Sequence, residues 1–137
     1  MYKRFSEEAK EVMQFANQEA QKLNHDYIGT EHILFGLLNS FQGIAWNIFL
    51  QLDVHPRKIR LELQKLVQAG EERASIGKLP NTPRVKKVLD IALQEVKACC
   101  KDMVGPVHLL LALASEQTFF QQRYYRVDLF GPFLYAS

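Results

Sequence analysis

The sequence has very little cysteine: Cys99 and Cys100 are the only two among 137 residues, and they are adjacent. Adjacent cysteines cannot close an ordinary long-range disulfide, and two thiols without further ligands make no structural zinc site. Disulfide-stapled and zinc-stabilised folds are therefore excluded. Cys99 falls on the apolar stripe of a predicted helix and is predicted to be a small core residue, whereas Cys100 is predicted to be exposed.

The chain also lacks a long apolar run and a strong excess of either charge. No apolar stretch approaches the roughly 20 residues that a membrane-spanning helix needs, and residues 1–12 are amphipathic rather than an apolar signal core. The 17 basic and 15 acidic residues are interspersed and leave a net charge of +2, far from the basic surface of a nucleic-acid-binding protein. We expect a cytoplasmic protein, or one of the plastid stroma in a plant, with neither nucleic acid nor membrane as a partner.

Catalytic and metal-binding motifs are missing as well. There is no G-x-x-x-x-G-K-[ST] loop, which excludes ATP hydrolysis by the usual P-loop route, and no Ser/His/Asp or Cys/His spacing that suggests a nucleophile. His32 and His108 have no second ligand at i+3 or i+4, so we interpret them as structural histidines near helix starts. His25 and His55 are interpreted as loop or cap residues. The sequence predicts no enzyme, no metal and no cofactor.

What the chain does contain is helical periodicity in a composition typical of one globular domain, with 47% apolar and 23% charged residues. The spacing predicts a helix over residues 6–24 with Ser6 as N-cap, a second helix capped by Thr30, and a short third helix from Ile44 to Gln51. A fourth helix restarts at Pro56 and continues toward Gly70. The expected inward residues of the last three are Ile33, Leu34, Leu37, Leu38; Ile44, Ile48, Phe49; and Ile59, Leu63, Leu66, Val67.

The pattern then repeats. Residues 70–81 lack an apolar stripe and are predicted to link two halves, after which Thr82 and Pro83 open a new helix. Residues 6–40 laid on residues 82–116, at an offset of 76 without gaps, share ten identities, and "YIGTEHILFGLL" (27–38) corresponds to "MVGPVHLLLALA" (103–114). Such self-similarity indicates an internal duplication.

We therefore predict one all-α domain with a pseudo-twofold duplicated helical repeat, the second repeat being truncated. Repeat one covers residues 1–69, the linker 70–81, an incomplete repeat two 82–129, and a divergent tail 130–137. Aromatic residues are dense towards the end of the chain, and they either cover the core of repeat two or form a protein-docking patch. These aromatic residues are Phe119, Phe120, Tyr124, Tyr125, Phe130, Phe133 and Tyr135.

Three phrases resemble a known family: the opening "MYKRFSEEAKEVMQFANQEAQKLNHDYIGTEHILFGLL", then "LPNTPRVKKVLDIALQEVK", and finally "VGPVHLLLAL". They are similar to the double Clp-N repeat that begins the Hsp100/Clp AAA+ unfoldases, most closely the ClpC type, over residues 1–117. The resemblance implies a non-catalytic front end that recruits adaptor proteins or tagged protein substrates to a Clp AAA+ ATPase and its protease. The alternative is a free-standing accessory subunit that docks on the Clp protease complex; the length of the native polypeptide separates the two.

The resemblance also implies a site. Some ClpC-type members recognise phosphoarginine through an acidic residue in the "GTEH" phrase, which Glu31 matches beside Thr30. A carboxylate suits the guanidinium part of that mark, and helix N-termini or cations suit its phosphate. By position near helix starts, the residues Ser6, Thr82, Arg84 and Lys86 are further candidates.

Both functional interpretations have a structural alternative. Glu31 in a first helical turn stabilises the helix dipole by about 0.3–1 kcal/mol without any ligand, and the basic group Arg84, Lys86 and Lys87 is typical of a solvated helix face. In repeat two, Pro106 and Val107 replace Thr30 and Glu31. A valine cannot pair with a guanidinium, so we predict at most one mark-binding site per chain.

Overall fold

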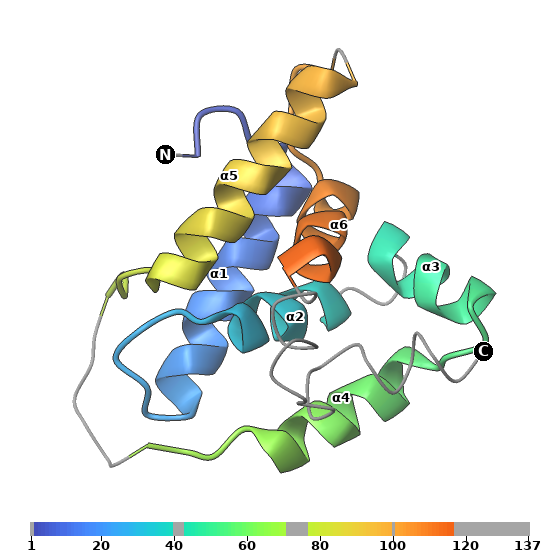
Figure 1. Cartoon of the computed structure of the whole chain (residues 1–137). Helices are drawn as coiled ribbons and strands as arrows, with labels where there is room; N and C mark the ends of the chain where they lie inside the picture. The colour runs from blue at the N-terminus through green and yellow to red at the C-terminus, as the bar shows by residue number, and fades with distance from the viewer. Residues whose placement is uncertain (1, 40–42, 71–76, 100, 117–137) are drawn as a thin grey trace.

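The computed structural model describes residues 2–39, 43–70, 77–99 and 101–116. These ranges contain six α-helices and no β-strand, only two isolated β-bridges, in agreement with the predicted all-α class (Figure 1). The helices are α1 (Glu7–Lys22), α2 (Thr30–Leu38), α3 (Ile44–Gln51), α4 (Pro56–Leu66), α5 (Pro83–Ala98) and α6 (Pro106–Glu116). Cys100 and the aromatic tail lie outside the described residues, so the predictions about them do too.

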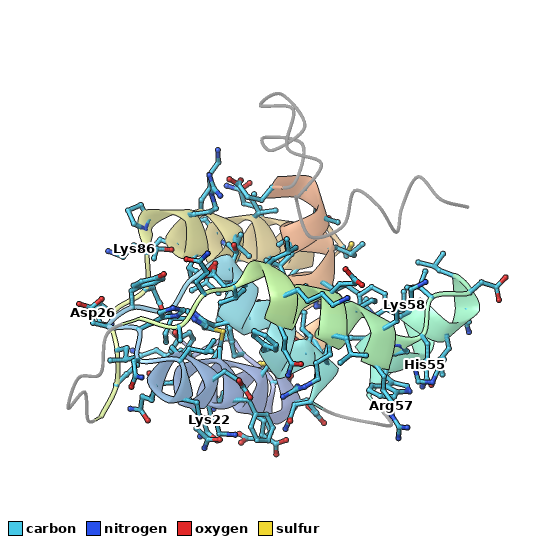
Figure 2. All side chains as sticks on the ribbon, turned by 90° about the horizontal axis from the view of Figure 1, so that it is seen from below. Lys22, Asp26, His55, Arg57, Lys58 and Lys86 are labelled. Carbon is cyan, nitrogen blue, oxygen red and sulfur yellow. The ribbon has the colours of Figure 1, made fainter. Side chains whose placement is uncertain are left out.

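Helix α2 forms the centre of the molecule and contacts each of the other five helices. It lies between α1 and α5, as the view from below shows (Figure 2). After its first turn, its short sequence "TEHILFGLL" is apolar on every side, and the residues from His32 to Leu38 are all buried. A helix that is apolar all round is stable only when other elements surround it.

Helices α1 and α5 follow the predicted amphipathic pattern. Ser6 and Thr82 cap them, because each hydroxyl oxygen accepts a hydrogen bond from the backbone N–H three residues later, at 3.1 Å from Ala9 and 3.2 Å from Val85. The predicted stripes are buried, with Ala9, Val12, Met13, Ala16 and Ala20 on α1, and Val85, Val88, Leu89, Ala92 and Val96 on α5.

Two parallel β-bridges join the halves: Phe5 pairs with Val104, and Ile28 with Asn81. The backbone N–H of Ser6 donates to the Val104 carbonyl at 2.8 Å, and that of Thr82 donates to the Ile28 carbonyl at 3.0 Å. At the offset of 76, Phe5 corresponds to Asn81 and Ile28 corresponds to Val104. The two bridges are therefore equivalent, each pairing one half with the other. The start of α1 therefore lies against the start of α6, and the start of α5 lies against the start of α2.

Helix α4 closes the first half. His55 caps it, since its Nδ1 accepts from the Arg57 N–H at 3.2 Å, which agrees with the predicted cap role. The Arg60 guanidinium lies 5.4 Å from the centre of the Phe35 ring and 3.3 Å from the Glu19 carboxylate, so this one side chain contacts both α2 and α1.

Some expected core residues are on the surface. Ile44 is 48% exposed and Leu66 47% exposed, and Cys99 is exposed too. Each lies at a helix end, where the periodic pattern runs past the packed part: Ile44 begins α3, Leu66 ends α4, and Cys99 is the C-cap of α5. Ala45 is buried in α3 instead.

Candidate functional site

The candidate site lies where the starts of α2 and α5 meet. The Ile28–Asn81 bridge sets their separation through two backbone hydrogen bonds. The Ile28 N–H donates to the Pro80 carbonyl at 2.8 Å, and the Ile28 carbonyl accepts from the Thr82 N–H. The first turns of the two helices thus lie in the same region. The positive ends of two helix dipoles favour negative charge there.

The start of α2 is capped differently from our expectation. Gly29, not Thr30, is the N-cap, and Thr30 is the first helical residue. Gly29 has no side chain to cap the helix, so Nδ1 of His32 reaches back and accepts the Gly29 N–H at 2.8 Å. A side chain on Gly29 would overlap the Glu31 carboxylate. Glycine at this position therefore makes room for Glu31 beside the turn.

Glu31 is a partly enclosed carboxylate beside the His32 ring. Its side chain is 29% exposed, and its Oε1 lies 3.6 Å from Nδ1 of His32. Burial raises the pKa of the Glu31 carboxyl above its usual value, while the charges of His25 and Arg84 and a backbone hydrogen bond partly oppose that rise. The charge of Arg84 is close enough to lower the pKa of Glu31, although burial outweighs it, so these two predicted site residues lie in the same region of the molecule.

Arg84 also contacts the end of α6. Its Nε lies 3.8 Å from Oε1 of Glu116, and Nζ of Lys87 lies 3.8 Å from Oε2 of the same carboxylate. Glu116 is only 7% exposed. A buried carboxylate between two cations restricts where both can lie, so Glu116 holds Arg84 and Lys87 near the end of α6.

The other predicted residues are divided. Thr82 caps α5 at this site, and Lys86 lines a pocket of about 400 Å³ with Tyr2, Lys78 and Pro80. Lys87 shares a helix face with Arg84, because the two are three residues apart. That i, i+3 spacing is the sequence pattern from which Lys87 could have been predicted as the partner of Arg84. Ser6 lies at the equivalent junction of α1 and α6, against Val104 and Gly105. Ser6 therefore lies at the second, equivalent junction, where Val107 stands in the position that corresponds to Glu31.

A chain of hydrogen bonds through two buried imidazoles holds the loop before α2 in place. Because Nδ1 of His32 accepts from Gly29, its Nε2 carries the proton and donates to Nδ1 of His25 at 2.8 Å. Nε2 of His25 then donates to the Gln68 carbonyl at 2.8 Å. The His25 ring also stacks on Tyr27, with ring centroids 5.2 Å apart. Burial, followed by the charge of His25, lowers the pKa of His32 from 6.5 to about 4.

Repeat two has half of this arrangement. His108 repeats the turn, since its Nδ1 accepts the Gly105 N–H at 2.9 Å. The position equivalent to His25 holds Lys101, however, and no imidazole pair forms there. His25 and Tyr27 had no sequence signal as a pair, because nothing in the spacing indicates that the loop before α2 folds back onto His32.

The arrangement suits a ligand that carries both charges. Glu31 can accept N–H donors, and Arg84 with the α5 N-terminus can contact an anionic group. Among the described residues, no cluster of three or more His, Cys, Asp or Glu side chains could hold a metal ion. The structural role of His32 accounts for both of its ring nitrogens.

Comparison with known proteins places the chain in a family. Residues 4–126 match the model of the Clp repeat (R) N-terminal domain. The ATP-dependent Clp protease ATP-binding subunit ClpA homolog from Guillardia theta is 36% identical over 116 residues. The match covers 85% of this chain and 14% of that protein. Chaperone protein ClpC1, chloroplastic, from Oryza sativa subsp. japonica is 35% identical over 116 residues, covering 85% of this chain and 12% of that protein. The chain thus spans a small fraction of the length of these relatives.

Solved structures show the same fold. The N-terminal domain of the chaperone ClpD from Arabidopsis thaliana has a TM-score of 0.64 at 20% identity, with 97% of this chain and 93% of that chain covered. The N-terminal domain of the ClpV1 ATPase from E. coli has a TM-score of 0.74 at 21% identity, with 98% and 78% covered. None of the helices in the described ranges is both long and apolar enough to cross a membrane. By its match over residues 4–126, the chain belongs to the Clp repeat N-terminal domain family.

Proposed function

We propose that this chain is a non-catalytic protein-binding module that recruits substrates or adaptors to a Clp-type AAA+ unfoldase, and that its first repeat binds a phosphoarginine-like mark. The site is supported by the Ile28–Asn81 bridge, which joins the starts of α2 and α5, and by the charge of Arg84, which acts on the pKa of the Glu31 carboxyl. The family and the ATP-binding Clp relatives support the wider role.

The geometry suggests how the mark is divided between the two halves. The guanidinium N–H groups of the mark face Glu31, and its phosphate faces Arg84 and the first-turn N–H groups of α5. Pro83 removes one N–H from that turn, which leaves Arg84 as the first residue of α5 that offers both a backbone donor and a side-chain cation. Glu116 and Lys87 hold that side of the site together.

Isothermal titration of free phosphoarginine into the wild-type chain tests the proposal. We expect one site per chain, and a loss of at least about tenfold in affinity for Glu31→Gln or Arg84→Gln, since each removes a charge-assisted hydrogen bond worth about 1.5–3 kcal/mol. Glu95→Gln is the matched control, because Glu95 lies on an exposed part of α5. Unmodified arginine should bind more weakly than phosphoarginine.

Two results would remove the mark-binding part of the proposal. One is the absence of heat from the wild-type chain at millimolar ligand. The other is an affinity that Glu31→Gln and Glu95→Gln change equally, because Glu31 would then be a first-turn residue that only complements the helix dipole. Either result leaves the family and the fold unchanged.

A further inference from the structure

A second feature of the surface is a groove on another side of the molecule. It lies between α1, the end of α2 and the start of α3, has a volume of about 300 Å³, and reaches Pro106 at the start of α6. Its apolar lining includes Val12, Phe15, Leu37 and Ile44. Ile44 is 48% exposed, so the rim presents a large aliphatic side chain to solvent.

The same groove carries negative charge. Glu8 and Glu11, one helical turn apart on α1, line it and are both exposed. No lysine or arginine lines it within the described part of the chain, and the neighbouring Lys10 is paired with Glu7 at 3.3 Å. A ligand in this groove therefore meets apolar contacts along the floor and two carboxylates along one edge.

The duplication shows that this charge is a difference between the halves. At the offset of 76, Glu8 corresponds to Arg84 and Glu11 to Lys87, the two cations that each lie 3.8 Å from the Glu116 carboxylate. The equivalent face of α1 thus has the opposite sign. An anionic group that suits the start of α5 is repelled at the start of α1, whereas a cationic group is attracted there.

We propose that this groove, defined by Val12, Phe15, Leu37, Ile44, Glu8 and Glu11, docks a peptide segment that presents basic and apolar side chains together. The apolar side chains fill the floor, and arginine or lysine side chains pair with the two glutamates at the edge. The groove is distinct from the Glu31 site, and it rests on the proposed function only in that the chain is taken to bind protein segments. It gives the module a way to hold an unmodified segment of a substrate or adaptor.

Fluorescence anisotropy with short labelled peptides tests this groove. The probe alternates leucine and arginine; its matched partners alternate leucine with glutamate and serine with arginine. We expect the leucine–arginine peptide to bind most tightly, and the Glu8→Gln/Glu11→Gln variant to weaken it about five- to tenfold, as expected for losing two exposed charge pairs. Ile44→Ser should weaken it as well, with less change in its dependence on salt concentration.

The controls separate the groove from other surfaces. Glu95→Gln removes one exposed acidic charge from α5 and should leave the affinity unchanged, and so should Glu31→Gln, which tests independence from the mark site. Circular dichroism melting of each variant checks that the fold is retained. NMR shift perturbation with the wild-type chain should centre on Phe15 and Ala45. Equal binding of the basic and acidic peptides, unchanged affinity in the double glutamine variant, or perturbation centred on another face would overturn the proposal.

Discussion

His32 shows how one side chain can serve both the fold and the site. Its Nδ1 accepts the Gly29 N–H at the start of α2, and its Nε2 donates to His25, which donates onward to Gln68. The loops before α2 and after α4 are thereby tied to each other through two rings. A proton added at Nδ1 of either ring would face an N–H donor, so the chain of hydrogen bonds requires both histidines to be neutral.

This requirement predicts a dependence of stability on pH. The folded pKa of His32 is lowered to about 4 from the ordinary 6.5, so the unfolded chain binds more protons between these values. The stability conferred by neutral His32 is present above pH 6.5 and is lost as the pH falls toward 4. Between pH 7 and pH 5 we expect the free energy of unfolding to fall by about 2 kcal/mol from this group.

Urea denaturation at a series of pH values measures the effect. His32→Gln should be less stable at pH 7, because Gly29 loses a well-placed acceptor, but its free energy of unfolding should change much less between pH 7 and pH 5. His108→Gln is the matched control, since His108 makes the same bond to Gly105 while being only partly buried. A wild-type slope that persists in His32→Gln would contradict the assignment.

At the level of the helices, the crossing of α1 and α2 depends on a glycine. A Cβ on Gly36 would overlap the backbone carbonyl oxygen of Val12, and it would lie 3.2 Å from a Val12 side-chain carbon. Backbone atoms cannot move aside as a flexible side-chain end can. The equivalent position in α6 is Ala112, which is buried and accommodated, so the two halves pack at different distances.

We therefore expect Gly36→Ala to destabilise the chain, although alanine is the better helix former by about 1 kcal/mol. Overpacking at this contact should cost about 1–3 kcal/mol in net terms, measured by thermal or chemical unfolding. The reverse exchange, Ala112→Gly, serves as a control and should cost about 1–2 kcal/mol, through lower helix propensity and the loss of a buried methyl group. If Gly36→Ala were as stable as the wild type, the close approach of the two helices would not be required.

The helices show where sequence reasoning is strong and where it stops. The extent of α3 and the caps of α1 and α5 were predicted, because capping chemistry and period are local. The exposure of Cys99, Ile44 and Leu66 was predicted wrongly, since a stripe shows which face points inward but not how far its neighbours extend along it. The sequence predicts Thr30 as the cap of α2, whereas Gly29 is the N-cap, because the return of the His32 side chain to Gly29 has no signature in local propensity.

On the scale of the whole molecule, the site depends on which helix starts meet. The offset of 76 shows that α1 corresponds to α5 and α2 to α6, but it does not show that the bridges pair Ile28 with Asn81 and Phe5 with Val104. That exchange places the start of α2, with Glu31, against the start of α5, with Thr82, and it places Ser6 against the start of α6, with Val107. The sequence could therefore indicate the candidate side chains, whereas their division between two junctions follows from the three-dimensional pairing.

The same exchange predicts what would be needed to build a second site. Val107→Glu alone should leave phosphoarginine binding at one site per chain, because Glu8 stands where Arg84 stands at the first site and would repel both the new carboxylate and the phosphate. Val107→Glu combined with Glu8→Arg restores the opposed charges, and we expect the stoichiometry measured by calorimetry to rise towards two. A Val107→Glu chain that already bound two equivalents would show that Arg84 is dispensable. A double variant that folds but binds only one would show that Glu31 and Arg84 need His25 and Lys87, which the second half lacks, to form a working site.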